Sequence, residues 1–543
     1  MSDNTFEYVV VGGGSAGCVV AGSLARAGRR VLLLEAGDSA EKNPETLRAG
    51  GYRDAFVNPR LLWERFSTAQ AGCSGKRIFV GTGRGVGGSG AVNAMVYLHG
   101  SAADFEAWPR GWRWSDVAPA YAKLDEAIGP GRRPATEFSS ACIAAAEACG
   151  LRESDDLNDG TLLARIGRER MNFAGEARRS SYAAFVAPEL SRAGSHLELW
   201  THARARRLNL ERADDGAIVA CGVELERGDT ASPARVTVRA EREVILCAGA
   251  LETPKLLMLS GIGPDHELRS HGIDVAVARG GVGANLHDHP CVTLFYRSAR
   301  PVDESYPQPY GFFRANPALP LAADVADTCY VFYPARSSLR EAMMRLLPSM
   351  ALPRVLYDNT PLPGLVRGGV DLAFRSAALR RFVERVYGIV VILGKPQSRG
   401  QLRLASANPR AFARVDPAYL THPADMQTML DGVALARRIA QSDALSRFGN
   451  RELMPGPRAA SRAKLERFIR GNAMTTYHFA GTCRLGDEDD DERVVDGALR
   501  LRGVRGLRVA DASVIPTLPV SAINAPSMMI GLRAAELAAA ERR

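Results

Sequence analysis

The segment that most constrains the fold is the N-terminal stretch EYVVVGGGSAGC, in which an apolar run is followed at once by glycines and a second apolar run. The hydrophobic pattern predicts a strand over 8–11, a helix over 16–26 and a second strand over 31–34. A strand, a tight turn and a helix that returns to a parallel strand form a βαβ unit, the building block of doubly wound sheets. The chain is therefore predicted to be an α/β protein with a Rossmann-like domain.

The glycines of this turn, Gly12, Gly14 and Gly17, have the GxGxxG spacing of dinucleotide-binding proteins. Glycine lets the backbone turn tightly and approach a pyrophosphate, whose negative charge is stabilised at the N-terminus of the helix. Glu35 ends the second predicted strand, where a carboxylate binds ribose hydroxyls. The strand, the glycines, the helix and the acid together indicate an adenine dinucleotide, either NAD or FAD.

The same residues permit two other interpretations. In the first, the glycines are turn residues without a ligand. In the second, Gly13, Ser15 and Gly17 spell GxSxG, the nucleophile elbow of α/β-hydrolases. However, an elbow after the first strand would be unusual for that fold, and Glu35 would have no function in it. Dinucleotide binding is therefore favoured over a hydrolase.

Composition narrows the class of protein further. A chain of 543 residues with 46% hydrophobic side chains is large enough for about two to four domains. No apolar run reaches the roughly 18 residues of a membrane-spanning helix, no signal peptide is visible, and the nine cysteines show no CxxC pairing. A cytoplasmic location is therefore expected. The net charge of +9 comes from dispersed arginines, so no nucleic-acid partner is predicted.

Five further blocks carry a family resemblance. They are GTGRGVGGSGAVNAMVYLHG (81–100), CAGALETPKLLMLSGIG (247–263), GVGANLHDHP (281–290), TTYHFAGTCRLG (475–486) and GLRVADASVIPTLPVSAINAPSMMIG (506–531). Their content and order resemble the glucose-methanol-choline (GMC) family of FAD-dependent oxidoreductases over nearly the whole chain. The first block is expected to be a Gly-rich loop leading into an apolar helix, and the last a strand ending at Asp511 followed by a helix opened by Pro526.

The resemblance implies a fold of two domains. A Rossmann-like FAD-binding domain is expected from the segments 1–120, 196–290 and 471–543, and a substrate-binding cap domain on an antiparallel sheet from 121–195 and 291–470. The cofactor would be FAD, bound by Gly12, Gly14, Ser15, Ala16, Gly17, Glu35, Ala36, Gly83, Gly87, Gly88, Ser89, Asn93, Ala94, Met95, Val96, Ala205, Ala248, Gly249, Asp511, Ala512, Asn524, Ala525 and Pro526. No histidine stands in the GGSGAVN stretch, where some relatives attach the flavin covalently, so noncovalent FAD is expected.

Alcohol oxidation requires a base beside the flavin, because the hydroxyl proton must leave while the α-hydrogen passes as hydride to flavin N5. Of the nine histidines, His478 in YHFAGTCRLG stands where the family's catalytic histidine stands. Tyr477 and Asn524 are predicted to accompany it, and Tyr477, His478 and Ala522 to face the substrate. His287 and His289 form an HxH pair, but no third ligand with suitable spacing follows, so no metal is predicted.

Ala522 is the main departure from the family pattern. Most relatives place Asn or His here as a partner of the catalytic histidine, whereas this chain reads VSAINAP. Three hypotheses follow. The first is an alcohol oxidase or dehydrogenase in which His478 acts alone or with Tyr477, Ser521 or water. The second is a non-standard flavin reaction of the lyase or light-driven decarboxylase type, and the third is a noncatalytic flavoprotein. A decarboxylase would be expected to place a cysteine and an arginine near the carboxylate, and Cys291 and Cys329 are the cysteines of that region.

The cap region contains one unusual stretch. Residues 336–385 hold nine arginines and four acidic residues interleaved with Leu, Met, Val and Phe. Such a stretch is typical of a solvated face of ordinary helices, of a lid over an apolar substrate, or of peripheral contact with the inner membrane surface. The predicted substrate is a bulky or hydrophobic alcohol, with O2, a quinone or another carrier as electron acceptor.

Overall fold

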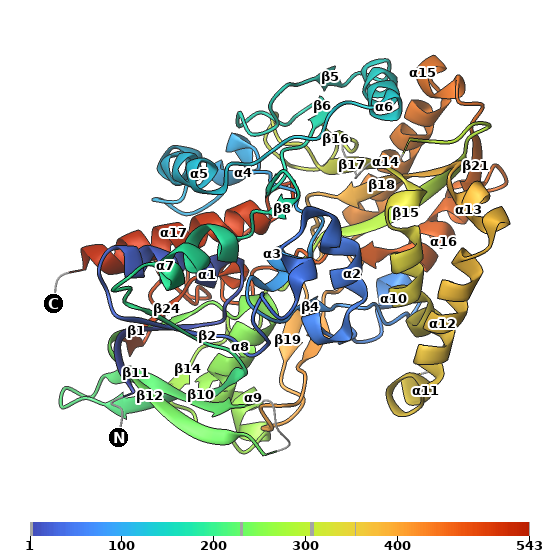
Figure 1. The fold of residues 1–543 in the computed structure, drawn as a ribbon. Helices are drawn as coiled ribbons and strands as arrows, with labels where there is room; N and C mark the ends of the chain where they lie inside the picture. Colours follow the sequence, from blue (N-terminus) through green and yellow to red (C-terminus); the bar gives the residue numbers. More distant parts are fainter. Residues whose placement is uncertain (1–3, 229–231, 304–308, 353, 542–543) are drawn as a thin grey trace.

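The computed structural model describes residues 4–228, 232–303, 309–352 and 354–541. These residues build two sheets of eight strands each, with helices packed around both (Figure 1). One sheet is mainly parallel and the other largely antiparallel, as the fold-class prediction required. No helix in these ranges is long and apolar enough to cross a bilayer.

The parallel sheet contains the first and the last strand of the described residues. Its core strands are β1 (Thr5–Val11), β2 (Val31–Leu34), β9 (Leu197–Trp200), β12 (Ala234–Leu246) and β24 (Leu507–Val509). The antiparallel strands β10 (Ala203–Arg212) and β11 (Ile218–Arg227) extend it beyond β12, and β23 (Val504–Arg505) pairs with β11. The predicted βαβ opening is confirmed, with α1 spanning Ser15–Arg26.

The first and last long helices of this domain lie side by side. Helix α17 (Asn524–Ala540) is apolar on nearly all sides and packs on α1, and α5 (Trp114–Ile128) packs on α17 (Figure 1). The predicted boundary between residues 120 and 121 therefore falls inside a helix that belongs with α17. Helix α17 also begins two residues before Pro526, so that proline lies in its first turn instead of opening it.

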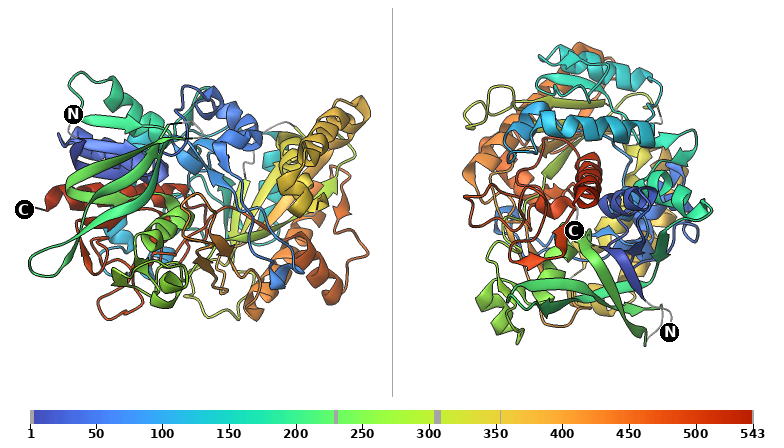
Figure 2. Two further views of the ribbon diagram at one scale, coloured as in Figure 1. Left: turned by 90° about the horizontal axis from the view of Figure 1, so that it is seen from below. Right: turned by 90° about the vertical axis from the view of Figure 1, so that its left-hand side faces the viewer.

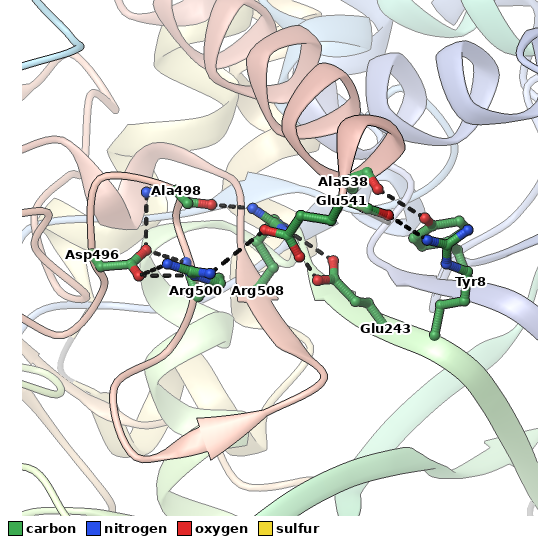
Figure 3. A network of polar contacts seen from close by, with 9 residues as sticks. Tyr8, Glu243, Asp496, Ala498, Arg500, Arg508, Ala538 and Glu541 are labelled. Atoms are coloured by element: carbon green, nitrogen blue, oxygen red, sulfur yellow. Dashed lines mark hydrogen bonds and ion pairs between the residues drawn. The ribbon is translucent and has the colours of Figure 1, made fainter. Parts of the chain in front are cut away.

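A buried arginine fixes the far end of α17. Arg508 has no exposed surface, and its guanidinium pairs with Glu243 at 2.9 Å and Glu541 at 3.0 Å, while Tyr8 Oη donates to the carbonyl of Ala538 at 3.0 Å (Figure 3). These contacts tie the last turn of α17 to β1, β12 and β24. Because the helix is rigid, fixing its last turn also fixes the position of its first turn, at Asn524.

The antiparallel sheet has the strand order β21 (Arg451–Met454), β15 (Pro290–Arg297), β18 (Val386–Leu393), β17 (Thr328–Pro334), β16 (Pro309–Phe313), β6 (Arg165–Arg168) and β5 (Arg152–Glu153). The short strand β22 (Met474–Thr475) pairs with the start of β15. Helices α14 (Pro423–Gln441) and α6 (Glu137–Glu147) cover one face. Since side chains alternate along a strand, Cys291, Cys329 and Ile392 point to the opposite face.

Helices join the two sheets at one side. The described part of the chain that connects β17 to β18 forms a layer of four helices: α10 (Leu339–Ala351), α11 (Arg354–Asn359), α12 (Leu362–Phe374) and α13 (Ala377–Val383). Helix α10 packs on α2 (Tyr52–Val57). The Gly-rich block 81–100 differs from its prediction, because its helix α3 is only Gly88–Val92 and the chain after it is irregular. The remaining helices of four residues or more are α4 (Ala102–Glu106), η5 (Tyr182–Val186), α7 (Ala187–Ser191), α8 (Gly249–Leu259), α9 (Asp265–Ser270), α15 (Asp443–Ser446) and α16 (Arg462–Asn472).

Candidate active site

A cavity of about 620 Å³ is lined by residues of both sheets. Most residues predicted to bind the cofactor or substrate line it: Gly12, Gly14, Ser15, Ala16, Glu35, Ala36, Gly83, Gly88, Ser89, Asn93, Ala94, Val96, Ala205, Ala248, Gly249, Tyr477, His478, Asp511, Ala512, Ala522 and Asn524. Gly17, Gly87, Met95, Ala525 and Pro526 lie behind this lining. The structure thus brings together segments from the beginning, middle and end of the chain.

Two glycines at the cofactor end of the cavity admit no side chain. A Cβ on Gly12, which has φ +106°, would lie 2.5 Å from the carbonyl oxygen of Cys247, and a Cβ on Gly17 would lie 1.9 Å from that of Gly12. Gly17 therefore lets α1 pack tightly against the turn, which explains why it lies behind the lining. Gly12 lets the ends of β1 and β12 approach each other.

Glu35 connects three segments around this end. Its Oε2 accepts a hydrogen bond from the Gly13 amide at 3.0 Å, and its Oε1 accepts from Gly37 at 2.7 Å and Gly85 at 3.0 Å. The carboxylate is buried, yet it lines the cavity and keeps an acceptor position on Oε2. It therefore both fixes the turn and presents an acceptor to a ligand hydroxyl.

Asn524, the first residue of α17, is held at the cofactor end. Ser15 Oγ donates to Asn524 Oδ1 at 2.7 Å, and a Cβ on Gly90 would lie 2.6 Å from that hydroxyl. The hydrogen bonds of the described residues include none between Asn524 and His478. Asn524 thus connects the dinucleotide turn to the first turn of α17, whose free amides favour negative charge.

At the other end of the cavity, His478 and His289 form a contact pair. Their Nδ1 atoms are 2.9 Å apart, the rings are perpendicular, and both residues line the cavity. The pair forms because β22 is antiparallel to β15, with Pro290 opposite Thr475. The segment preceding β15 therefore lies beside the segment following β22.

Thr476 sets the proton positions in this pair. Its hydroxyl donates to the carbonyl of His289 at 2.9 Å, and the same oxygen is 3.0 Å from Nδ1 of His478. Because the single hydroxyl hydrogen is engaged, the oxygen must accept from His478, which places a proton on His478 Nδ1. His289 Nδ1 is then the acceptor of the 2.9 Å contact. The lone pair of a neutral His478 is left on Nε2.

Asp288 holds the backbone of this segment. It accepts hydrogen bonds from the amide of His478 at 2.6 Å, from Thr475 Oγ1 at 2.5 Å and from the Tyr419 hydroxyl. Burial nevertheless raises the pKa of Asp288 to about 6, because desolvation outweighs these donors. The carboxyl is thus a structural anchor behind the histidines.

Burial also keeps the histidines neutral. It lowers the pKa of His478 to about 4, and burial with the neighbouring His478 lowers the pKa of His289 well below its usual range. His287, the other member of the HxH pair, contacts the carbonyl of Asn285 at 2.6 Å and not the His478 ring. At neutral pH, His478 is therefore an uncharged imidazole with a free nitrogen.

One part of the cavity wall is apolar. Ala522 packs against a cluster that includes Cys329, Ile392, Val520 and Val96, all of which line the cavity. The neighbouring Ser521 also lines it, and its buried hydroxyl has no hydrogen-bond partner among the described residues. The small polar side chain of Ser521 thus neighbours position 522, where the family pattern has the larger Asn or His.

Sequence reasoning missed His289. The HxH spacing is a visible signal in the sequence, but His289 lines the cavity and His287 does not. What connects His289 with His478, 189 positions later, is the pairing of β15 with β22. That pairing has no signature in either segment alone.

The fold and the cavity define a class of protein: a two-domain protein with a Rossmann-like dinucleotide-binding domain and a second domain on an antiparallel sheet. Family comparisons agree, because GMC oxidoreductase profiles match residues 6–291 and 396–531. The chain belongs to the FAD-dependent GMC oxidoreductase family, as the sequence blocks predicted.

Individual relatives match over nearly the full chain. A chloroplastic fatty acid photodecarboxylase of Chlamydomonas reinhardtii is 32% identical, covering 98% of this chain and 90% of its own. An oxygen-dependent choline dehydrogenase of Sinorhizobium fredii is 30% identical over 98% of this chain and 95% of its own. Among solved structures, pyridoxine 4-oxidase from Mesorbium loti aligns with a TM-score of 0.82 at 26% identity, covering 99% of this chain and 100% of that one.

Proposed function

We propose that this oxidoreductase oxidises a primary or secondary alcohol to a carbonyl, with His478 as the base. The observation that carries the proposal is the geometry around His478 Nδ1, which lies 3.0 Å from Thr476 Oγ1 and 2.9 Å from His289 Nδ1. From these contacts we assign the ring proton to Nδ1 and the lone pair to Nε2. Burial lowers the pKa of His478 to about 4, so the imidazole is unprotonated at neutral pH and its Nε2 lone pair is available to a hydroxyl proton.

The residues at the cofactor end fit FAD. The tight glycine turn at Gly12 suits a pyrophosphate, and the free acceptor position on Glu35 suits a ribose hydroxyl. The first turn of α17 suits a ring that carries negative charge. When bound, FAD supplies the acceptor for the hydride that leaves the alcohol carbon. His478 Nε2 takes the hydroxyl proton, and the apolar wall excludes water.

We propose a bulky or hydrophobic substrate. Ala522, Cys329, Ile392 and Val520 offer dispersion contacts instead of hydrogen bonds, and the small Ala522 lines the same cavity as His478. Ser521 is the nearest candidate in sequence to replace the missing polar partner.

The test is anaerobic stopped-flow absorbance with a panel of apolar alcohols and polyols. Bleaching of the oxidised flavin by an alcohol supports the proposal, and preference for polyols would contradict the apolar substrate class. Ala522→Asn narrows the site, so small alcohols should gain rate while bulky ones lose it, by about tenfold in each direction. If both classes respond alike, Ala522 does not face the reacting alcohol.

A second candidate reaction is light-driven decarboxylation of a fatty acid. It is favoured by Cys329 in the cavity wall together with the Chlamydomonas relative. The three arginines among the described residues that line the cavity all have other contacts: Arg53 stacks on Tyr52, Arg204 stacks on Trp63 and Arg410 pairs with Glu226. Hydrocarbon formation from a fatty acid under blue light, absent in the dark, would establish this reaction in place of alcohol oxidation.

The proposal also covers the attachment of the flavin, the electron acceptor, the domain boundaries and the location of the protein. We propose noncovalent FAD, because His99 is engaged by Asp125 at 2.9 Å and does not line the cavity; release of the flavin on acid precipitation tests this. The electron acceptor is O2, a quinone or another carrier, distinguished by the rate of reoxidation in air. We retain the predicted domain segments, with residues up to 128 assigned to the FAD-binding domain, and a cytoplasmic location.

A further inference from the structure

The helical layer α10–α13 concentrates the exposed apolar surface of the chain. Among the described residues, five of the eight exposed large hydrophobic side chains lie on α11, α12 and α13: Val355, Leu356, Leu365, Leu372 and Phe382. Leu365 and Leu372 are each 67% exposed and Val355 72%. Exposed apolar side chains gathered on helices that pack against each other are typical of a docking site.

Helix α12 is oriented with its apolar side outwards. Leu365, Gly368, Gly369 and Leu372 are spaced to share one face, and all four are exposed. Its charged residues point the other way. Arg367 pairs with Glu64 of the FAD-binding domain at 3.0 Å, and Asp371 pairs with Arg340 of α10. Ion pairs on the inner side thus leave the outer side free of charge, the reverse of an ordinary surface helix.

This layer also belongs to the wall of the active-site cavity. Ser338, Glu341, Ala342 and Leu346, at the start of and along α10, line the cavity, while α12 packs on the outer side of α10. Figure 2 shows the layer at the end of the molecule opposite the two chain termini. The exposed apolar face and the cavity are therefore separated by one helix.

The rim of the exposed face is basic. Arg375 is 74% exposed at its side chain, and Arg380 and Arg381 on α13 are also exposed. Two acidic groups whose side chains the structure describes here are paired: Asp371 contacts Arg340 and Arg375, and Glu384 lies 3.9 Å from Arg336. An apolar centre with a basic rim complements an anionic lipid surface, whereas two such rims would repel each other in a dimer.

We propose that the outer face of α11–α13 docks the protein on an anionic lipid bilayer, with Leu365 and Leu372 inserted among the acyl chains and Arg380 and Arg381 at the headgroups. Docking places the cavity wall formed by α10 next to the bilayer. The inference rests on the surface alone and holds whichever reaction the cavity performs.

The experiment is co-sedimentation of the FAD-loaded protein with vesicles of phosphatidylglycerol and phosphatidylcholine in equal parts, and with phosphatidylcholine alone. The wild type should bind the anionic vesicles more tightly. Leu365→Ser with Leu372→Ser should lower the partition coefficient about tenfold. The matched control is Leu190→Ser with Leu453→Ser, which are 39% and 40% exposed on other elements and should change binding by less than about twofold.

Charge and depth are tested separately. Arg380→Gln and Arg381→Gln should each weaken binding to anionic vesicles about fivefold, with little effect on neutral ones. Leu372→Trp provides a variant that adds apolar surface, and its fluorescence should shift to the blue when anionic vesicles are added. Unchanged flavin content in each variant shows that the fold is intact.

Two results would overturn the proposal. One is vesicle binding that is absent, or equal in the leucine variant and its control. The other is a wild-type dimer in analytical ultracentrifugation that the leucine variant loses, which would assign this face to a second copy of the chain.

Discussion

The two ends of the cavity are built in different ways. The cofactor end is built around a backbone turn, which Gly12 and Gly17 close and one of whose amides donates to the Glu35 carboxylate. The reaction end consists of side chains, with His289 and His478 in contact inside an apolar wall. A backbone site requires glycines at fixed spacing, so sequence reveals it. A side-chain site depends on which strands pair.

The largest effect is expected at the cofactor end. Gly17→Val places a side chain where a Cβ would already be 1.9 Å from the carbonyl oxygen of Gly12, so β1 and α1 must separate. We expect no flavin-loaded protein and a loss of stability above about 4 kcal/mol. Flavin absorbance after purification and urea unfolding measure this. Gly50→Val, at a position with open space around it, should behave like the wild type.

His478→Ala breaks the reaction end while sparing the cofactor end. Flavin content should stay normal, and anaerobic flavin reduction by substrate should slow by about 10²- to 10⁴-fold, because the proton acceptor is lost. Stopped-flow absorbance measures the rate, with the exposed His266→Ala as control. Normal reduction in His478→Ala would remove this residue as the base.

His289→Leu asks how much the orientation of His478 matters. With the Nδ1 contact gone, only Thr476 still fixes the ring, so flavin reduction should slow by about a hundredfold or less. The lost contact should also shift the pH profile of reduction. A change in substrate affinity alone, with the same limiting rate and profile, would limit His289 to a packing role.

The smallest effect concerns stability against pH. Burial lowers the pKa of His478 from 6.5 to about 4, so below pH 6.5 the unfolded chain binds a proton that the folded one does not. His478 therefore lowers stability as pH falls from 6.5 towards 4, by about 1.4 kcal/mol per pH unit. His478→Gln should flatten the curve of unfolding free energy by that slope. Parallel curves for the two proteins would mean that His478 is charged in the folded state.

These differences show what sequence could and could not predict. The strands β1 and β2 and the glycine turn were predicted closely, because their hydrophobic runs and spacing are local. Residues 336–385 were recognised as arginines among apolar residues, but their orientation was not predicted. The charged side chains of α12 face inwards because Arg367 pairs with Glu64 and Asp371 pairs with Arg340. Their partners are distant in the sequence, so the hydrophobic pattern of α12 alone does not reveal this orientation.

The packing of α17 on α1 has a consequence for how the protein is made. Ser15 reaches its partner Asn524 only after 509 further residues have been synthesised. At roughly 5 to 20 residues per second, the first helix waits about 25 to 100 s on the ribosome for the last one. The Ser15–Asn524 contact is therefore completed only after the start of α17 has been synthesised. Chains truncated before α17 would accumulate without cofactor, with the apolar side of α1 exposed to chaperones and proteases.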